Sequence, residues 1–135
     1  MNLKIGTKGL LSHCVADHDL ATHWANDVPV LATPVLLWLA ELAAIRAIGD
    51  CLDPALMTLG YSHDVRHLAP TPKGWIVQIE AEVISIDEKI ISFEITGSDG
   101  VDVVLSGVHK RGVVNKQRFL SRVDAKTEEY KLRAI

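Results

Sequence analysis

The sequence has little of what would mark a metal protein, a disulfide-stabilised protein, a membrane protein or a nucleic-acid-binding protein. Its two cysteines, Cys14 and Cys51, match no metal-ligand spacing and need not form a disulfide. Three early histidines recur every five residues, which does not place them on one helix face: His13, His18 and His23. The longest apolar run is interrupted by prolines and is too short to span a bilayer. The formal net charge of -3 argues against nucleic acid as the main partner.

Length and composition indicate one domain. The chain has 135 residues, of which 48% are hydrophobic, so it can form a core and is too apolar to be disordered. It contains no internal repeat and no Gly/Ser-rich linker, and we expect a single domain over residues 1–135. The first residues, Met1 to Gly6, lack the continuous apolar core of a secretory signal. We therefore expect a cytoplasmic protein that does not bind membranes.

An almost entirely apolar helix is predicted over residues 34–48. Thr33 can serve as its N-cap, Pro34 suits the first helical position, and Gly49 suits the end of the helix. Both faces of this helix carry apolar side chains. We therefore expect it to be buried nearly all round.

A single carboxylate, Glu41, interrupts the apolar surface of this helix. A buried carboxylate must find a partner or shift its pKa, and that cost in free energy is typical of functional sites. A structural role is the alternative, in which Glu41 pairs with Arg46 or Lys110 or lies on a short exposed strip. The helix alone leaves both roles open.

The rest of the chain mostly follows the period of two that is typical of β-strands. Turn signals such as Ser98-Asp99-Gly100 separate the alternating segments. The predicted strands are residues 9–15, 57–68, 75–86, 90–97 and 101–115. The segment between the first strand and the helix is predicted to be a loop or a short helix, and residues 116–135 a charged segment with a short helix.

This order of elements predicts an α+β fold. One long helix followed by a meander of antiparallel strands packs most economically when the sheet curves around the helix. Edge strands in such a sheet invite pairing with a second copy of the chain. We therefore expect a homodimer.

Chemically competent residues lie where the predicted elements meet. Thr33 lies at the helix entrance and His67 at the end of the second strand, although an N-cap and a structural histidine are common roles for such residues. Gly60 lies within the second strand, where a bulge is the alternative reason for a glycine. About 12 Å of helical rise separates Thr33 from Glu41, so direct contact between them is not expected. A second subunit or the curved sheet would have to bring His67 near.

Four segments, in order and at matching spacings, resemble the fluoroacetyl-CoA thioesterase and its hotdog-fold relatives. The first is Ala32-Thr33-Pro34 followed by Trp38 and Glu41-Leu42-Ala43-Ala44-Ile45-Arg46-Ala47. The second comprises Leu59-Gly60, His67 and Thr71-Pro72-Lys73-Gly74. The last two are Ser98-Asp99-Gly100-Val101-Asp102 and Gly107-Val108-His109-Lys110-Arg111. The resemblance extends from about residue 3 to residue 126.

The resemblance implies a hotdog fold and hydrolysis of a small acyl-CoA thioester. In that family the residues matching Thr33, Glu41 and His67 are catalytic, and those matching Gly60 and Arg111 lie at the substrate site. Thr33 would be the nucleophile or a hydroxyl donor, Glu41 the nucleophile or general base, and His67 an acid/base or a donor that orients the thioester. No metal or cofactor is implied, since CoA is part of the substrate.

Two further expectations concern the substrate. Arg111 opens a basic C-terminal segment, and we expect it to contact the phosphates of CoA. The fluoroacetyl-specific enzyme has phenylalanines before the helix, whereas residues 24–30 here have Trp24 and, at the second position, Asp27 or Val28. The resemblance therefore supports the reaction class more than the acyl group. A non-catalytic protein that binds acyl-CoA or a small apolar ligand is the alternative.

Overall fold

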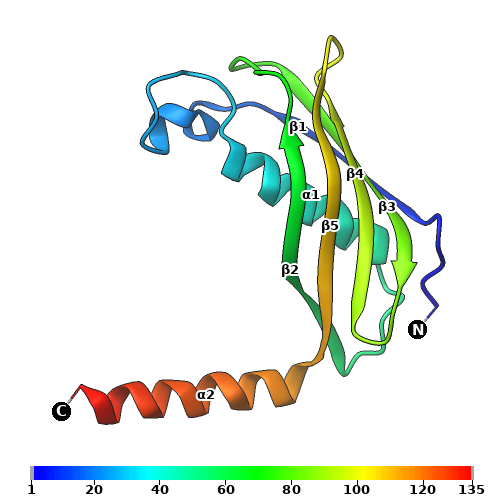
Figure 1. Ribbon diagram of the computed structural model, residues 1–135, viewed down its shortest axis with the longest axis vertical. Helices are drawn as coiled ribbons and strands as arrows, with labels where there is room; N and C mark the ends of the chain where they lie inside the picture. Colours follow the sequence, from blue (N-terminus) through cyan, green and yellow to red (C-terminus); the bar gives the residue numbers. More distant parts are fainter. Residues whose placement is uncertain (1, 135) are drawn as a thin grey trace.

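The computed structural model describes residues 2–134, which form one curved sheet, a helix along it and a second helix that projects away (Figure 1). In chain order the elements are β1 (Lys8–Cys14), α1 (Thr33–Ile48), β2 (Leu56–His67), β3 (Ile76–Ile86), β4 (Ile90–Ser98), β5 (Val103–Asn115) and α2 (Lys116–Arg133). Two short 3-10 turns, Asp17–Asp19 and Ala21–His23, lie in the segment predicted to be a loop or a short helix. None of the helices in the described residues is long and apolar enough to cross a membrane.

The sheet is antiparallel, with the strand order β1-β3-β4-β5-β2. Each of the five strands was predicted, and each observed end lies within two residues of the predicted one. The sheet curves around α1, as expected (Figure 1). Strands β1 and β2 form its two edges, so β2 has a free side for pairing.

Helix α1 is buried on one side only, and the prediction of burial all round was wrong. Leu36, Leu39 and Ala43 are buried against the sheet, whereas Trp38 is 52% and Ile45 is 46% exposed. A curved sheet can cover only one side of a helix. Because both sides of α1 are apolar, sequence periodicity could not show which side packs against the sheet of its own chain and which side stays exposed.

The ends of α1 differ from the prediction at one residue. Ala32 is the N-cap and makes no side-chain cap, while Thr33 is already helical, so Thr33 does not cap the helix. Gly49 ends the helix with φ at +52°, as its glycine suggested. The hydroxyl of Thr33 is therefore available for another partner.

Helix α2 is much longer than the short helix predicted for this segment. It spans 18 residues, begins directly where β5 ends, and has no buried residue. Asn115 caps it by accepting a hydrogen bond from the Arg118 backbone N–H at 2.9 Å. Residues with high helix propensity and the Asn115 cap favour this length, although the helix buries none of its residues.

Candidate active site

Glu41 lies in a network of polar side chains between α1 and the β2–β5 pair. Arg111 on β5 donates from Nη1 to Glu41 Oε1 at 3.0 Å, and His63 on β2 donates from Nε2 to Glu41 Oε2 at 3.3 Å. The carboxylate therefore has one donor on each oxygen. The side chain of Glu41 is 33% exposed, so one part of it faces away from the protein interior.

Arg111 is held from several directions. Its Nε donates to the Thr58 hydroxyl at 2.9 Å and its Nη2 to the Thr58 carbonyl at 3.2 Å. Its side chain is only 5% exposed. The expected contact of Arg111 with the phosphates of CoA was therefore wrong, because the guanidinium lies inside the protein beside Glu41. The alternative role for Glu41, an ion pair, is present, but its partner is Arg111 and neither Arg46 nor Lys110.

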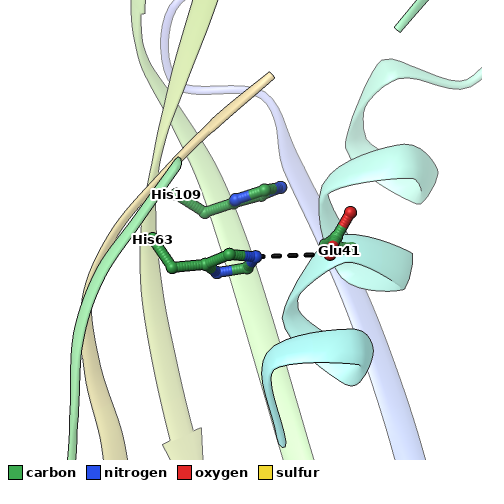
Figure 2. A group of neighbouring side chains, drawn as sticks. All are labelled: Glu41, His63 and His109. Atoms are coloured by element: carbon green, nitrogen blue, oxygen red, sulfur yellow. Dashed lines mark hydrogen bonds and ion pairs between the residues drawn. The ribbon is translucent and has the colours of Figure 1, made fainter. Parts of the chain in front are cut away.

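Two histidine rings lie beside Glu41 (Figure 2). His63 and His109 face each other across the β2–β5 ladder, and their rings stack with centroids 4.1 Å apart. His109 donates from Nδ1 to the Ser62 carbonyl at 2.9 Å, so its Nε2 can accept from Arg111 Nη1 at 3.2 Å. Burial lowers the pKa of His109 to about 4, which keeps this ring neutral near neutral pH.

Glu41 is held in its ionised form by these neighbours. Partial burial alone would raise the pKa of Glu41, but hydrogen bonds from His63 and Arg111 and the nearby positive charge outweigh burial and lower it. A carboxylate with these donors is suited to act as a base or as a nucleophile. It is poorly suited to donate a proton.

The same group of side chains has the composition of a metal site. Ligand atoms of Glu41, His63 and His109 all lie within 4.8 Å of one another. The permanently charged guanidinium of Arg111, however, lies 3.0 Å from Glu41 and 3.2 Å from His109 Nε2. A metal cation would have to displace Arg111, so these residues fit a hydrogen-bond network better than a metal centre.

Gly60 lies directly over the carboxylate. A Cβ atom at this position would lie 2.5 Å from Glu41 Oε1, so no other residue fits without moving Glu41. The β2–β5 register also shifts between Gly60 and Ser62, which confirms the bulge considered as the alternative reason for this glycine. The two explanations coexist, since the bulge brings the bare backbone of Gly60 next to Glu41.

Thr33 and His67 form a separate pair at the entrance of α1. Their Oγ1 and Nδ1 atoms are 2.7 Å apart. Burial lowers the pKa of His67, which favours the neutral imidazole that can accept the hydroxyl proton of Thr33. The other ring nitrogen, Nε2, is buried and has no hydrogen-bond partner among residues 2–134. The pair has the composition of a hydroxyl nucleophile and its base.

This pair lines a cavity of about 440 Å³. Trp24 and Val28, from the segment before α1, contribute apolar walls to the cavity, and Asn26 contributes an amide. Of the two residues considered for the second aromatic position, Val28 is the one that lines it. The hydroxyl–imidazole pair therefore faces a cavity whose other walls are largely apolar.

The predicted site residues thus form two clusters. Thr33 pairs with His67, while Gly60 and Arg111 surround Glu41 eight residues further along α1, about 12 Å in helical rise. Sequence reasoning missed His63 and His109. A signal existed, because residues two or four apart on a strand share a face: His63 with His67, and His109 with Arg111.

Solved structures identify the class of protein that this fold defines. A thioesterase-superfamily protein from Thermus thermophilus has a TM-score of 0.91 at 18% identity, covering 98% of this chain and 99% of that one. The solved fluoroacetyl-CoA thioesterase FlK has a TM-score of 0.87 at 30% identity, covering 93% of this chain and 98% of that one. The fold is the hotdog fold of the thioesterase superfamily, as predicted.

Sequence comparison narrows this class to a family. The family model described as "fluoroacetyl-CoA-specific thioesterase" matches residues 15–117. The fluoroacetyl-CoA thioesterase of Streptantibioticus cattleyicolor is 31% identical over 132 residues, covering 93% of this chain and 95% of that protein. The chain belongs to the fluoroacetyl-CoA-specific thioesterase family. This membership confirms the predicted thioesterase class, and no finding favours the non-catalytic ligand-binding alternative.

Proposed function

We propose that this protein hydrolyses a small acyl-CoA thioester to a carboxylate and free CoA, using Thr33, Glu41 and His67. The observation that carries the proposal is the 2.7 Å contact between Thr33 Oγ1 and His67 Nδ1 in the wall of a 440 Å³ cavity. A hydroxyl paired with a neutral imidazole is one arrangement that activates a nucleophile for acyl transfer. A solved complex of the related FlK contains fluoroacetate and CoA, which supports a CoA thioester as the substrate.

The chemistry divides between the two clusters. Thr33 attacks the thioester carbonyl as His67 takes the hydroxyl proton, and the same imidazole returns that proton to the departing CoA thiolate. Water then attacks the acyl group on Thr33 while the ionised Glu41 takes a proton from it. The ester bond to Thr33 Oγ1 breaks as that proton passes from Glu41 to the threonine oxygen, and the product acid leaves as a carboxylate after losing its own proton to solvent. The missing side chain of Gly60 leaves room for the Glu41 carboxylate, and Arg111 holds that carboxylate in place.

We propose further that the catalytic unit is a homodimer, with Thr33 and His67 of one protomer facing Glu41 of the other. Within one chain the helical rise between Thr33 and Glu41 is about 12 Å, too long for both to act on one carbonyl. The open side of α1 exposes the apolar side chains of Trp38 and Ile45, which lie about one helical turn before and after Glu41. The β2 edge offers strand pairing to a second copy.

For the substrate we propose a short acyl group without selectivity for fluorine. The walls formed by Trp24 and Val28 are apolar but differ from the phenylalanines of the fluoroacetyl-specific enzyme. The reaction needs no cofactor or metal, and nucleic acid and membranes are not partners. A cytoplasmic location agrees with the unpaired Cys14 and Cys51, since reducing compartments keep thiols free.

A panel of acyl-CoA esters, assayed for thiol release, tests the function. Acetyl-, fluoroacetyl-, propionyl-, butyryl- and a long-chain acyl-CoA are compared for kcat/KM in wild type and in the variants Glu41→Gln and His67→Ala. We expect a short acyl group to be preferred and each variant to lose about 100-fold or more of kcat/KM. If both variants hydrolyse the best substrate as fast as wild type, the catalytic assignment is wrong.

A further inference from the structure

His63 takes no part in the reaction steps above. Its Nε2 lies 3.3 Å from Glu41 Oε2. An ionised carboxylate only accepts hydrogen bonds, so the neutral ring must carry its proton on Nε2. Its Nδ1 then holds a lone pair, and this atom is buried without a hydrogen-bond partner among residues 2–134. A buried polar atom without a partner costs stability, so an apolar side chain would be the more stable choice if His63 only filled space.

The ring of His63 is fixed in the plane that points Nε2 at Glu41 (Figure 2). It stacks on His109 with an interplanar angle of 17°. His109 is itself fixed by its hydrogen bond to the carbonyl of Ser62, the residue before His63. Burial lowers the pKa of His109 to about 4, so the stacked neighbour is neutral near neutral pH. The scaffold therefore orients His63 without the help of a ligand.

The two donors to Glu41 bind different oxygens of its carboxylate. Arg111 donates to Oε1, the carboxylate oxygen nearer to Gly60, and His63 donates to the other oxygen, Oε2. A single donor would leave the carboxylate free to rotate about its last side-chain bond, whereas two donors from different strands fix its plane. The groups that face Glu41 are His63 from β2 and Arg111 and His109 from β5.

We propose that His63 is a positioning residue for hydrolysis: it locks the plane of the Glu41 carboxylate and keeps it ready to accept a proton from water. The proposal rests on the proposed role of Glu41 and adds a second histidine to the site. His63 acts only through Glu41, so its loss should lower kcat more than it changes KM.

The test compares His63→Leu, which keeps the volume and removes the donor, with His63→Gln, which keeps an N–H donor. His18→Leu is the matched control, since the exposed ring of His18 lies beside a different carboxylate, that of Asp19. The carboxyl groups are followed by carbon NMR in protein labelled at the glutamate side-chain carboxyl, and Glu41→Gln identifies the Glu41 signal. Thermal unfolding of each variant confirms that it is folded.

We expect the titration midpoint of Glu41 to rise by about one pH unit in His63→Leu and by less in His63→Gln. We also expect kcat to fall about tenfold or more in His63→Leu, with partial recovery in His63→Gln and no change in His18→Leu. An unchanged midpoint, or an unchanged kcat in a folded His63→Leu variant, overturns the proposal. Full activity of Glu41→Gln would instead overturn the role of Glu41 itself, and this variant therefore separates the two failures.

Discussion

Gly60 is packed against Glu41 so closely that a single added carbon would lie 2.5 Å from the Oε1 atom of the carboxylate. Gly60→Ala should therefore push Glu41 away from Arg111 and lower kcat/KM about tenfold or more. The matched control is Gly112→Ala, because Gly112 lies on the neighbouring strand and a carbon added there meets nothing within 4 Å. Steady-state kinetics measure kcat/KM of the two variants, and only Gly60→Ala should show the loss. Equal activity of both would show that the position of Glu41 over Gly60 does not matter.

Mixed dimers test whether the two clusters act across a subunit interface. Glu41→Gln and His67→Ala chains should each be inactive alone. When the two are unfolded and refolded together, half of the dimers should be mixed, and each mixed dimer should contain one site with both wild-type clusters. The mixture should then recover about one quarter of wild-type activity. A mixture as inactive as its components would place each complete site within one chain.

Removal of Arg111 should affect stability as well as activity. Arg111→Met keeps most of the side-chain length but leaves Glu41 without its cation and the Thr58 carbonyl without a donor. We expect the free energy of unfolding to fall by about 2 kcal/mol or more. Denaturant titration measures this change. The adjacent Lys110 is exposed, and Lys110→Met should change stability by less than about 0.5 kcal/mol. Similar losses from both substitutions would contradict the buried role of Arg111.

Stability should fall on acidification because of His109. Burial lowers the pKa of this histidine from 6.5 to about 4, so between these pH values the unfolded chain binds a proton that the folded chain does not. The stabilising effect of a neutral ring is therefore complete above about pH 6.5 and declines as the pH falls toward 4. Over that range we expect a loss of roughly 3 kcal/mol from His109 alone.

The variant His109→Gln isolates this contribution, because glutamine cannot take up the proton and can still hydrogen bond. Urea unfolding at a series of pH values should give a flatter dependence for the variant than for wild type between pH 6.5 and 4. Parallel curves for the two proteins would mean that His109 is protonated as easily in the folded chain as in the unfolded one.

The strands could be predicted because their alternation is a local property of the chain. Val77, Ile79 and Ala81 face the core, and the residues between them do not. The side of α1 that stays open could not be predicted, because apolar side chains fill both sides and only the surrounding structure decides which is covered. Trp38 and Ile45 therefore looked like core residues.

Sequence reasoning selected single residues of the candidate site but not their arrangement, and it missed His63 and His109. Glu41 stood out as a carboxylate in an apolar helix, yet its partners lie on strands distant in sequence, and only the β2–β5 register brings His63 and Arg111 to it. The pair of Thr33 and His67 depends in the same way on the path of β2 beside the start of α1. Long-range register is set by the whole sheet and not by any single motif.

Helix α2 should unfold locally before the rest of the molecule does. Its 18 residues bury no side chain, so little beyond its own hydrogen bonds and its Asn115 cap holds it together. Its backbone amides should exchange with solvent deuterium through frequent local fraying, long before those of α1 or β4 become accessible. In a protein of this size, the first helical signal lost on warming would then report on the C-terminal helix alone, while the clusters around Glu41 and Thr33 stayed intact.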